Sequence, residues 1–228
     1  MKFRILLLHF ILIAPFRSLS QINDASVWEN IFLEKKITQR TSFHINEEGR
    51  FNQNATRFYY IYLDGGASYR LNKHISFMLD YVIIEKRIPD DFWSTRHQAY
   101  VAMILKKKIW RFHISDRIMP QVQFSDYNSS EHGHLPDYRL RNKVAVKYNN
   151  DSRFTYYIAS EIYWKINSYY KNNLPQGKQL DRIRYFAGVF YEFNAKNEIE
   201  LYYLYENNFN LNKPTNNYIF GIGFAHEF

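Results

Sequence analysis

Two short groups of residues have types and spacing that could perform chemistry. In the first, His113 and Ser115 are separated by one residue, and Asp116 follows directly. A histidine beside a serine can take the hydroxyl proton and turn the serine into a nucleophile for acyl transfer. Such a site also needs a group that orients the histidine, and the sequence identifies none. We therefore interpret the pair as two polar residues and predict no catalytic residue.

The second group is Glu131-His132-Gly133-His134, which lies in a stretch rich in turn-forming residues. Two imidazoles and a nearby carboxylate can hold Zn²⁺ or Cu²⁺. Histidines in a polar connection more often serve only as polar side chains, so we predict no metal site. The sequence contains no glycine-rich phosphate loop, nucleotide motif or calcium-binding repeat, and we predict no cofactor.

The composition excludes several classes of protein. The 228 residues include no Cys, which excludes a disulfide framework, a thiolate metal site and a lipidated N-terminal cysteine. The 20 Tyr, 19 Phe and 4 Trp are too many for a disordered or coiled-coil chain. No apolar run approaches the length of a transmembrane helix, which excludes a helical membrane protein.

The first twenty residues have the features of a secretory signal. Lys2 and Arg4 precede an apolar stretch over residues 5–14, and Ser18-Leu19-Ser20 places small residues before a cleavage point. An uncleaved anchor is the disfavoured alternative, because nothing apolar extends beyond Pro15 and Phe16. We predict a signal peptide over 1–20 and one domain over 21–228.

The net charge of +8 at first indicates a nucleic-acid partner. Exported chains rarely meet nucleic acid, and the basic residues alternate with apolar ones and form no local patch. We therefore predict no nucleic-acid binding.

Almost every segment after residue 27 alternates apolar and polar residues with the period of a β-strand, and no segment has a convincing helical period. In the last segment, Tyr218, Phe220 and Ile222 share one face, and Ile219, Gly221 and Gly223 share the other. The pattern predicts strands near 27–37, 41–50, 57–71, 75–86, 95–105, 109–124, 138–148, 154–166, 182–193, 198–206 and 218–228.

The connections between these segments alternate in length. Short links fall near 38–40, 72–74, 106–108, 149–153 and 194–197, and longer links fall near 51–56, 87–94, 125–137, 167–181 and 207–217. Short periplasmic turns and long outer loops are typical of an up-and-down transmembrane β-barrel. Its strands must close into a barrel because lipid leaves no backbone group solvated. We predict an all-β, antiparallel transmembrane barrel.

The number of strands is less certain than their positions. Eleven segments conflict with the even number that is usual in bacterial single-chain barrels. Either segment 27–37 is not a full wall strand or one segment is divided wrongly, so we predict 10–12 strands. Asp116 falls on the apolar face of its segment, which indicates a bulge there, and Pro120 indicates a local break or a stretch already outside the bilayer.

The two faces of the strands have different compositions. Aromatic residues occur near strand ends, as in the interfacial belts of membrane barrels, with Tyr69, Trp110, Tyr148, Phe154 and Phe193 near short turns and Tyr138, Trp164, Tyr205 and Tyr218 near long loops. The opposite faces mix charged residues with Tyr, Gly and Ala, which suits a crowded, wet lumen. A soluble sandwich is the disfavoured alternative, because its polar faces need no partners.

Alternation assigns a set of charged residues to the lumen, with an excess of basic groups. A water-filled lumen of this kind should favour anions, whereas charges that pair across it would plug the barrel. We favour a plugged or very narrow lumen, since a barrel of this size leaves little space. The assigned residues are Asp64, Arg70, Asp80, Arg96, Arg111, Arg117, Arg139, Arg141, Glu161, Arg182, Arg184, Glu192 and Glu200.

Several stretches resemble those of a known family. They are Val27-Trp28 through Leu33-Glu34-Lys35-Lys36, Gly65-Gly66-Ala67-Ser68-Tyr69-Arg70-Leu71-Asn72, Arg139-Leu140-Arg141-Asn142, Asp181-Arg182-Ile183-Arg184-Tyr185 and Phe220-Gly221-Ile222-Gly223-Phe224. The mature chain resembles an uncharacterised group of Gram-negative outer-membrane barrels known only as a domain of unknown function. The resemblance implies location and architecture but no activity. The last strand, with Phe224 and terminal Phe228, also resembles the signal read by the barrel-assembly machinery, which is therefore an expected transient partner.

The expected function is that of an integral outer-membrane barrel of a Gram-negative bacterium, in contact with outer-membrane lipid. It is either a narrow, porin-like channel for an unidentified small solute or a closed structural barrel, and we predict that it is not an enzyme. One alternative is a lipid hydrolase using His113 and Ser115, because His-x-Ser on a barrel strand resembles outer-membrane lipid hydrolases. Another is a surface-binding barrel using loops 125–137 and 167–181.

Overall fold

The computed structural model describes residues 22–87, 92–125, 136–149, 152–166, 179–209 and 214–228. The predicted signal peptide over 1–20 lies outside these residues. None of the described residues belongs to a helix long and apolar enough to cross a membrane. The strands are β1 (Ile22–Lys36), β2 (Thr41–Asn52), β3 (Arg57–Arg70), β4 (Ile75–Arg87), β5 (Trp93–Ile109), β6 (Phe112–Ser125), β7 (Asp137–Asn149), β8 (Phe154–Lys165), β9 (Gln179–Asn194), β10 (Asn197–Asn208) and β11 (Thr215–Glu227).

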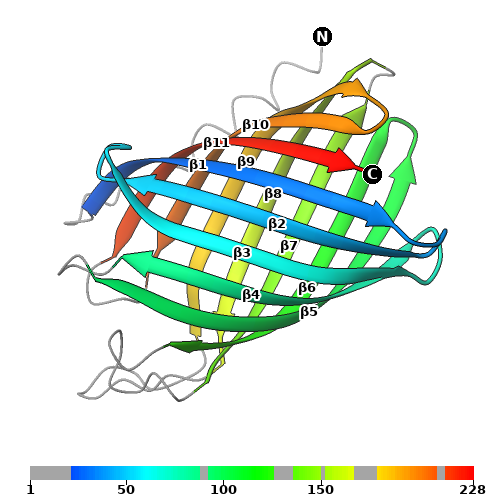
Figure 1. The fold of residues 1–228 in the computed structure, drawn as a ribbon. Helices are drawn as coiled ribbons and strands as arrows, with labels where there is room; N and C mark the ends of the chain where they lie inside the picture. The colour runs from blue at the N-terminus through cyan, green and yellow to red at the C-terminus, as the bar shows by residue number, and fades with distance from the viewer. Residues whose placement is uncertain (1–21, 88–91, 126–135, 150–151, 167–178, 210–213) are drawn as a thin grey trace, which may run out of the picture.

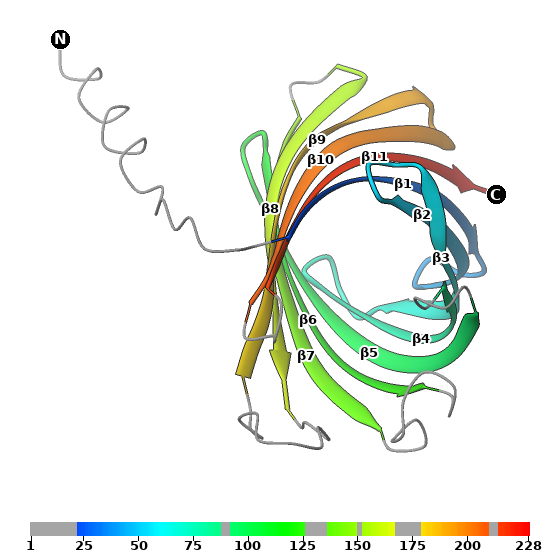
Figure 2. The ribbon, with the colours of Figure 1, turned by 90° about the vertical axis from the view of Figure 1, so that its left-hand side faces the viewer.

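The eleven strands form one closed barrel in the order β1-β11-β10-β9-β8-β7-β6-β5-β4-β3-β2. Consecutive strands pair antiparallel, and Figures 1 and 2 show them curving around a common interior. The predicted all-β, largely antiparallel barrel is confirmed. Each segment predicted from the alternation corresponds to one strand, although β1 begins earlier and β5 ends later than predicted.

The barrel closes through a parallel pair. β1 and β11 run side by side in the same direction, from Ile22 opposite Thr215 to Glu34 opposite Glu227. An odd number of up-and-down strands requires this, because the first and last strands then point the same way. Both explanations offered for the odd count are therefore wrong. Segment 27–37 belongs to a full wall strand, and no segment is divided wrongly.

Two apolar clusters lie inside the barrel. Trp28, Leu204 and Ile219 pack beside the parallel seam, and all three are buried. The other cluster joins β4, β5 and β6 through Val82, Ile84, Tyr100, Ala102 and Met119. The interior therefore combines apolar packing with the charged residues described below.

One turn differs from the prediction. Lys106–Lys108 are not a link, because they pair with residues 113–115 as part of the β5–β6 ladder. The turn consists of Trp110 and Arg111, and Trp110 has a positive φ of 55°, as tight two-residue hairpins require. The three lysines resemble a loop by composition, but an exposed strand keeps all three side chains in solvent equally well.

Asp116 does not mark a bulge. The register of β6 with β5 and with β7 is continuous on both sides of this residue. Instead, Asn142 Nδ2 donates a hydrogen bond of 2.5 Å to Asp116 Oδ1. Both residues alternate with cavity-lining neighbours, so they face outward, and the polar pair satisfies itself within the outer wall. Among the described strand pairs, register shifts occur instead at Arg50/Phe51, Tyr163/Trp164 and Asn197/Glu198.

The barrel wall has an inverted distribution of polarity. Leu79, Ile158 and Phe220 are 62%, 63% and 64% exposed in the middle of their strands, whereas Asp80 and Glu161 are 2% and 1% exposed. Soluble proteins rarely leave such a continuous apolar surface uncovered, and they rarely bury acidic side chains completely. The alternation therefore directs the apolar faces outward and the charged faces into the lumen.

Candidate functional site

The candidate site is the lumen, which contains a cavity of about 940 Å³ lined by side chains from all eleven strands. Small-molecule sites usually occupy about 300–1,000 Å³, so the cavity has room for a small solute. Ten of its lining residues are basic and seven are acidic. The basic ones are Arg50, Lys86, Arg96, Arg117, Arg139, Arg141, Lys143, Lys165, Arg182 and Arg184, and the acidic ones are Asp24, Glu48, Asp64, Asp137, Glu161, Glu200 and Glu206.

Most of the charged residues that alternation assigned to the lumen line this cavity, namely Asp64, Arg96, Arg117, Arg139, Arg141, Glu161, Arg182, Arg184 and Glu200. Asp80 is buried next to the cavity. The others lie toward the ends of strands. Arg70 and Glu192 are exposed near short turns, and Arg111 belongs to the two-residue turn rather than to a strand. The alternation of the sequence therefore predicts which mid-strand residues line the cavity, but it does not predict this near the strand ends.

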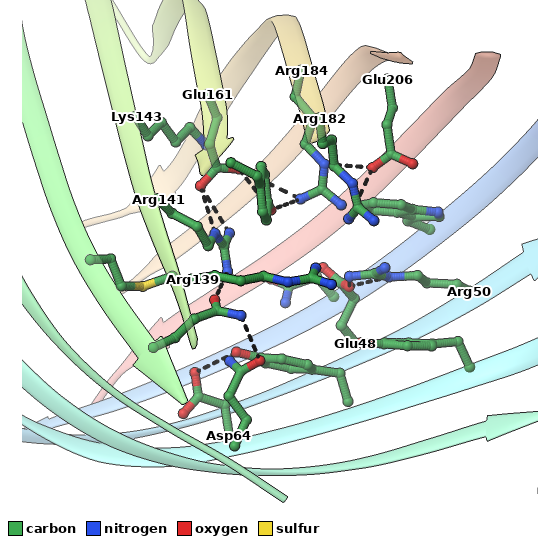
Figure 3. Close-up of a pocket in the computed structure, with 18 of the residues that line it drawn as sticks. Glu48, Arg50, Asp64, Arg139, Arg141, Lys143, Glu161, Arg182, Arg184 and Glu206 are labelled. Carbon is green, nitrogen blue, oxygen red and sulfur yellow. Dashed lines mark hydrogen bonds and ion pairs between the residues drawn. The ribbon is translucent and has the colours of Figure 1, made fainter. Parts of the chain in front are cut away.

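A continuous ion-pair network follows one side of the lumen. Arg117 Nη2 and Arg141 Nη2 each lie 2.9 Å from Glu161 Oε1. Arg184 joins the two acids of the network, since its Nη1 lies 3.5 Å from Glu161 Oε2 and its Nε lies 2.7 Å from Glu206 Oε2. The five residues come from the consecutive strands β6 to β10, and Figure 3 shows most of them around the cavity. We name them the Glu161 network.

Tyr163 stiffens this network. Its ring lies under the guanidinium groups of Arg141, Arg182 and Arg184 at 4.5, 4.9 and 4.9 Å. Its hydroxyl donates to Glu161 Oε2 at 3.1 Å. Cations are attracted to the face of an aromatic ring, and buried charges need partners. Tyr163 thus adds cation–π contacts and a hydrogen bond to the ion pairs of the network.

Other cations near the long connections are not paired in this way. Lys86 and Arg139 form no ion pair with any residue in the part of the chain that the structure describes. The largest charge effects on Lys86 come from Arg96, Arg182, Arg50 and Arg139, which are all positive. In Figure 3, Arg139 and Arg50 extend into the cavity from opposite sides. This end of the lumen is therefore positively charged.

His113 and Ser115 do not form an assembled catalytic site. Both lie on β6 near the Trp110–Arg111 turn, and neither lines the large cavity. Within the described residues, no hydrogen bond joins the two side chains. Asp116 faces outward and bonds to Asn142, so it does not orient the histidine.

Among the described residues, the structure brings together one group of side chains that could hold a metal ion and that the sequence analysis did not predict. His44, Asp64 and Asp80 are buried, and each offers a ligand atom within 4.8 Å of the others. They come from three strands and form no sequence motif, so only the pairing of the strands reveals them. The other candidate, with His132 and His134, lies outside the described residues, as do most of loops 125–137 and 167–181.

The comparison with known proteins agrees with the resemblance drawn from the sequence. No curated protein matches the chain. A family profile, whose description is "Protein of unknown function (DUF2490)", matches residues 25–217, from β1 into β11. The matched region includes every residue of the Glu161 network and the His44, Asp64 and Asp80 group. The chain therefore belongs to the DUF2490 family of proteins of unknown function.

Proposed function

We propose that this protein is an integral outer-membrane barrel of a Gram-negative bacterium, and that its lumen is a narrow, anion-preferring pathway for small solutes. The observation that carries the proposal is the charge of the cavity, where Lys86 and Arg139 lack ion-pair partners among the described residues. A narrow lumen with low-dielectric walls and an excess of one charge concentrates ions of the opposite sign.

The outer surface supports the membrane location. Strands of 12 to 17 residues exceed the about 9–11 residues that a tilted strand needs to cross hydrocarbon. Exposed aromatic side chains lie near both ends of the wall, including Tyr69, Phe154 and Phe193 near short turns and Tyr138 and Trp164 near long connections. Aromatic girdles at both interfaces are typical of outer-membrane barrels. Outer-membrane lipid would then contact the apolar face.

The C-terminus supports recognition by the barrel-assembly machinery. Phe224 and Phe228 are exposed on the last strand and at its end, with 38% and 60% of their surfaces accessible. An assembly factor could read such side chains before the β1–β11 seam forms. With short turns on the periplasmic side, this end of the chain would remain in the periplasm.

Planar-bilayer recording tests the pathway. We expect small conductance steps from the refolded barrel and a reversal potential in a KCl gradient that indicates a preference for Cl⁻. Replacing Lys86 and Arg139 together by glutamine should reduce the preference, because it removes two cavity-lining cations that form no ion pair within the described residues. The matched control is Lys107→Gln, which changes an exposed lysine outside the cavity. A folded wild-type barrel without conductance steps would contradict the pathway and favour a closed structural barrel.

We also propose that the protein is not an enzyme. Two observations support this proposal. Asp116 bonds to Asn142 and does not orient His113, and within the described residues no hydrogen bond joins His113 and Ser115. Phospholipid hydrolysis assays on the wild type and Ser115→Ala test this directly. We expect no hydrolysis by either protein, and activity that disappears in Ser115→Ala would support the lipid hydrolase instead.

A further inference from the structure

A row of three paired residues crosses β2, β3 and β4 on the inner face of the barrel. His44 pairs with Gly66, and Gly66 pairs with Asp80. Asp64 lies two residues before Gly66 on β3 and therefore also faces inward. The side chains of His44 and Asp80 are 1% and 0% exposed, and Asp64 is 4% exposed. Strand pairing alone thus brings an imidazole and two carboxylates together.

Gly66 permits this arrangement. A Cβ atom at this position would overlap the carboxylate of Asp80 and the backbone oxygen of Leu79. Without that atom, Asp80 lies over β3, and its Oδ1 contacts His44 Nε2 from two strands away. Phe32 stacks on the imidazole of His44, with 5.6 Å between the ring centroids, and fixes its orientation.

The three side chains retain unused donor atoms. His44 Nδ1, Asp64 Oδ1 and Asp80 Oδ2 are buried and have no hydrogen-bond partner. The other oxygen of Asp64 accepts hydrogen bonds from Tyr100 at 2.7 Å and from Tyr62 at 3.4 Å. A buried polar atom without a partner costs about 1–3 kcal/mol, and more when it is charged. Each of these three neighbouring side chains therefore has a buried atom that a bound ion could satisfy.

The local charge has the sign that a metal ion would neutralise. The acids that act on His44 are Asp80, Asp64 and Glu34. No lysine or arginine forms an ion pair with Asp64 or Asp80 within the described residues. Elsewhere the same lumen supplies three arginines to the single carboxylate of Glu161. Apart from His44 itself, no basic side chain of the described residues therefore pairs with these two carboxylates.

We propose that His44, Asp64 and Asp80 bind a divalent transition-metal ion, with Zn²⁺ as the best match. One imidazole nitrogen and two carboxylate oxygens are ligands that Zn²⁺ accepts, whereas Mg²⁺ and Ca²⁺ prefer oxygen alone. His44 and Asp64 also line the large cavity, so the ion would be accessible to water or solute from the lumen. The proposal does not depend on conduction through the barrel.

Metal content tests the proposal. The full barrel is refolded in detergent, stripped with a chelator, incubated with Zn²⁺ alone and freed of excess metal. We expect one Zn²⁺ per chain by elemental analysis and no comparable retention of Mg²⁺. Replacement of His44 by glutamine, and of Asp64 or Asp80 by asparagine, should weaken Zn²⁺ binding at least about tenfold. Circular dichroism and heat-modifiable gel mobility verify that each variant is folded.

A control variant separates this site from the loop histidines. Replacing His132 and His134 together by glutamine leaves the buried group intact, so we expect the same Zn²⁺ content as in the wild type. The proposal is overturned if the stripped wild type retains no Zn²⁺, if this loop variant loses it, or if folded Asp64→Asn and Asp80→Asn bind it as tightly as the wild type. Thermal unfolding gives a second measurement, because Zn²⁺ should raise the midpoint only where it binds.

Discussion

The barrel buries carboxylates on two sides of its lumen and compensates them in different ways. Glu161 on β8 forms ion pairs with three arginines, from β6, β7 and β9. Asp64 and Asp80 are similarly buried but have tyrosine hydroxyls, a histidine and each other as neighbours. The carboxylate of Glu161 is therefore neutralised by arginines of the barrel itself. Asp64 and Asp80 form no ion pair with a lysine or arginine of the described residues.

Strand pairing explains the difference. Glu161 lies opposite Lys143 on one side and Arg184 on the other. Asp80 lies opposite Gly66 and Tyr100, neither of which carries a positive charge. A buried acid that is flanked by cations contributes to the wall, and one that is flanked by glycine and tyrosine is available to bind a cation. The cross-strand neighbours therefore distinguish a structural charge from a binding group.

Among the substitutions that test this comparison, Glu161→Gln should cause the largest loss in the free energy of unfolding. It leaves Arg117, Arg141 and Arg184 close together without their shared anion. Removing one partner of a buried ion pair typically costs about 3–5 kcal/mol, and we expect a loss of that size in the free energy of unfolding. Urea titration of the barrel in lipid vesicles measures it. Asp137→Asn is the control, since its partner Lys165 is 3.7 Å away and its side chain is 33% exposed. Equal losses in both variants would contradict the central role of Glu161.

Gly66→Ala should have the next largest effect. The added methyl group would overlap the Asp80 carboxylate and the backbone oxygen of Leu79. Overpacking of this kind costs about 1–3 kcal/mol, and we expect a loss of about 2 kcal/mol by the same titration. Gly65→Ala is the matched control, because a Cβ there meets no atom within 4 Å. Similar losses at both glycines would show that the row is not tightly packed.

Asp64→Asn should instead increase the free energy of unfolding of the metal-free barrel. It relieves repulsion with Asp80 while its amide oxygen still accepts a hydrogen bond from Tyr100. Ligand atoms of the two carboxylates lie within 4.8 Å of each other, and two like charges that close repel by a few kcal/mol. Removing this repulsion should outweigh the interactions that the carboxylate loses. We expect a gain of about 1 kcal/mol, measured without metal and with chelator. Destabilisation of the metal-free barrel would show that the two acids are already compensated.

Lys36→Ala should have the smallest effect. Lys36 Nζ lies 2.5 Å from Glu227 Oε1 at the end of the parallel seam, but both side chains are well exposed. Exposed ion pairs contribute about 0–1 kcal/mol, so we expect a loss below about 0.5 kcal/mol. Thermal melting at low and high salt measures it. A large loss at low salt would show that the seam depends on this contact.

The sequence predicts the strands and their faces well, because alternation follows directly from the geometry of a strand. Mid-strand residues such as Arg141 and Glu161 line the cavity as their positions in the alternation indicate. The prediction fails at Arg111 and at Lys106–Lys108, where composition alone does not separate a charged strand end from a turn.

The sequence does not specify which residues lie opposite each other on neighbouring strands. His44 and Asp80 meet only because the register places both opposite Gly66. The available signals were a histidine on the polar face of one predicted strand and the glycine pair Gly65-Gly66 in the next. Likewise, the odd number of predicted segments was interpreted as an error of assignment, and only the pairing of β1 with β11 shows that a parallel seam accommodates it.

The parallel seam also separates the two ends of the folded chain. β1 begins beside the start of β11, so Ile22 and Glu227 lie at opposite rims of the barrel. In a barrel with an even number of strands, both ends would meet at the same rim and a short linker could join them. Here a circularised chain would need a tether on the order of 40 Å long. If the barrel spans a bilayer, epitope tags at the two ends would be exposed to different compartments, and antibody labelling of intact cells would detect only one.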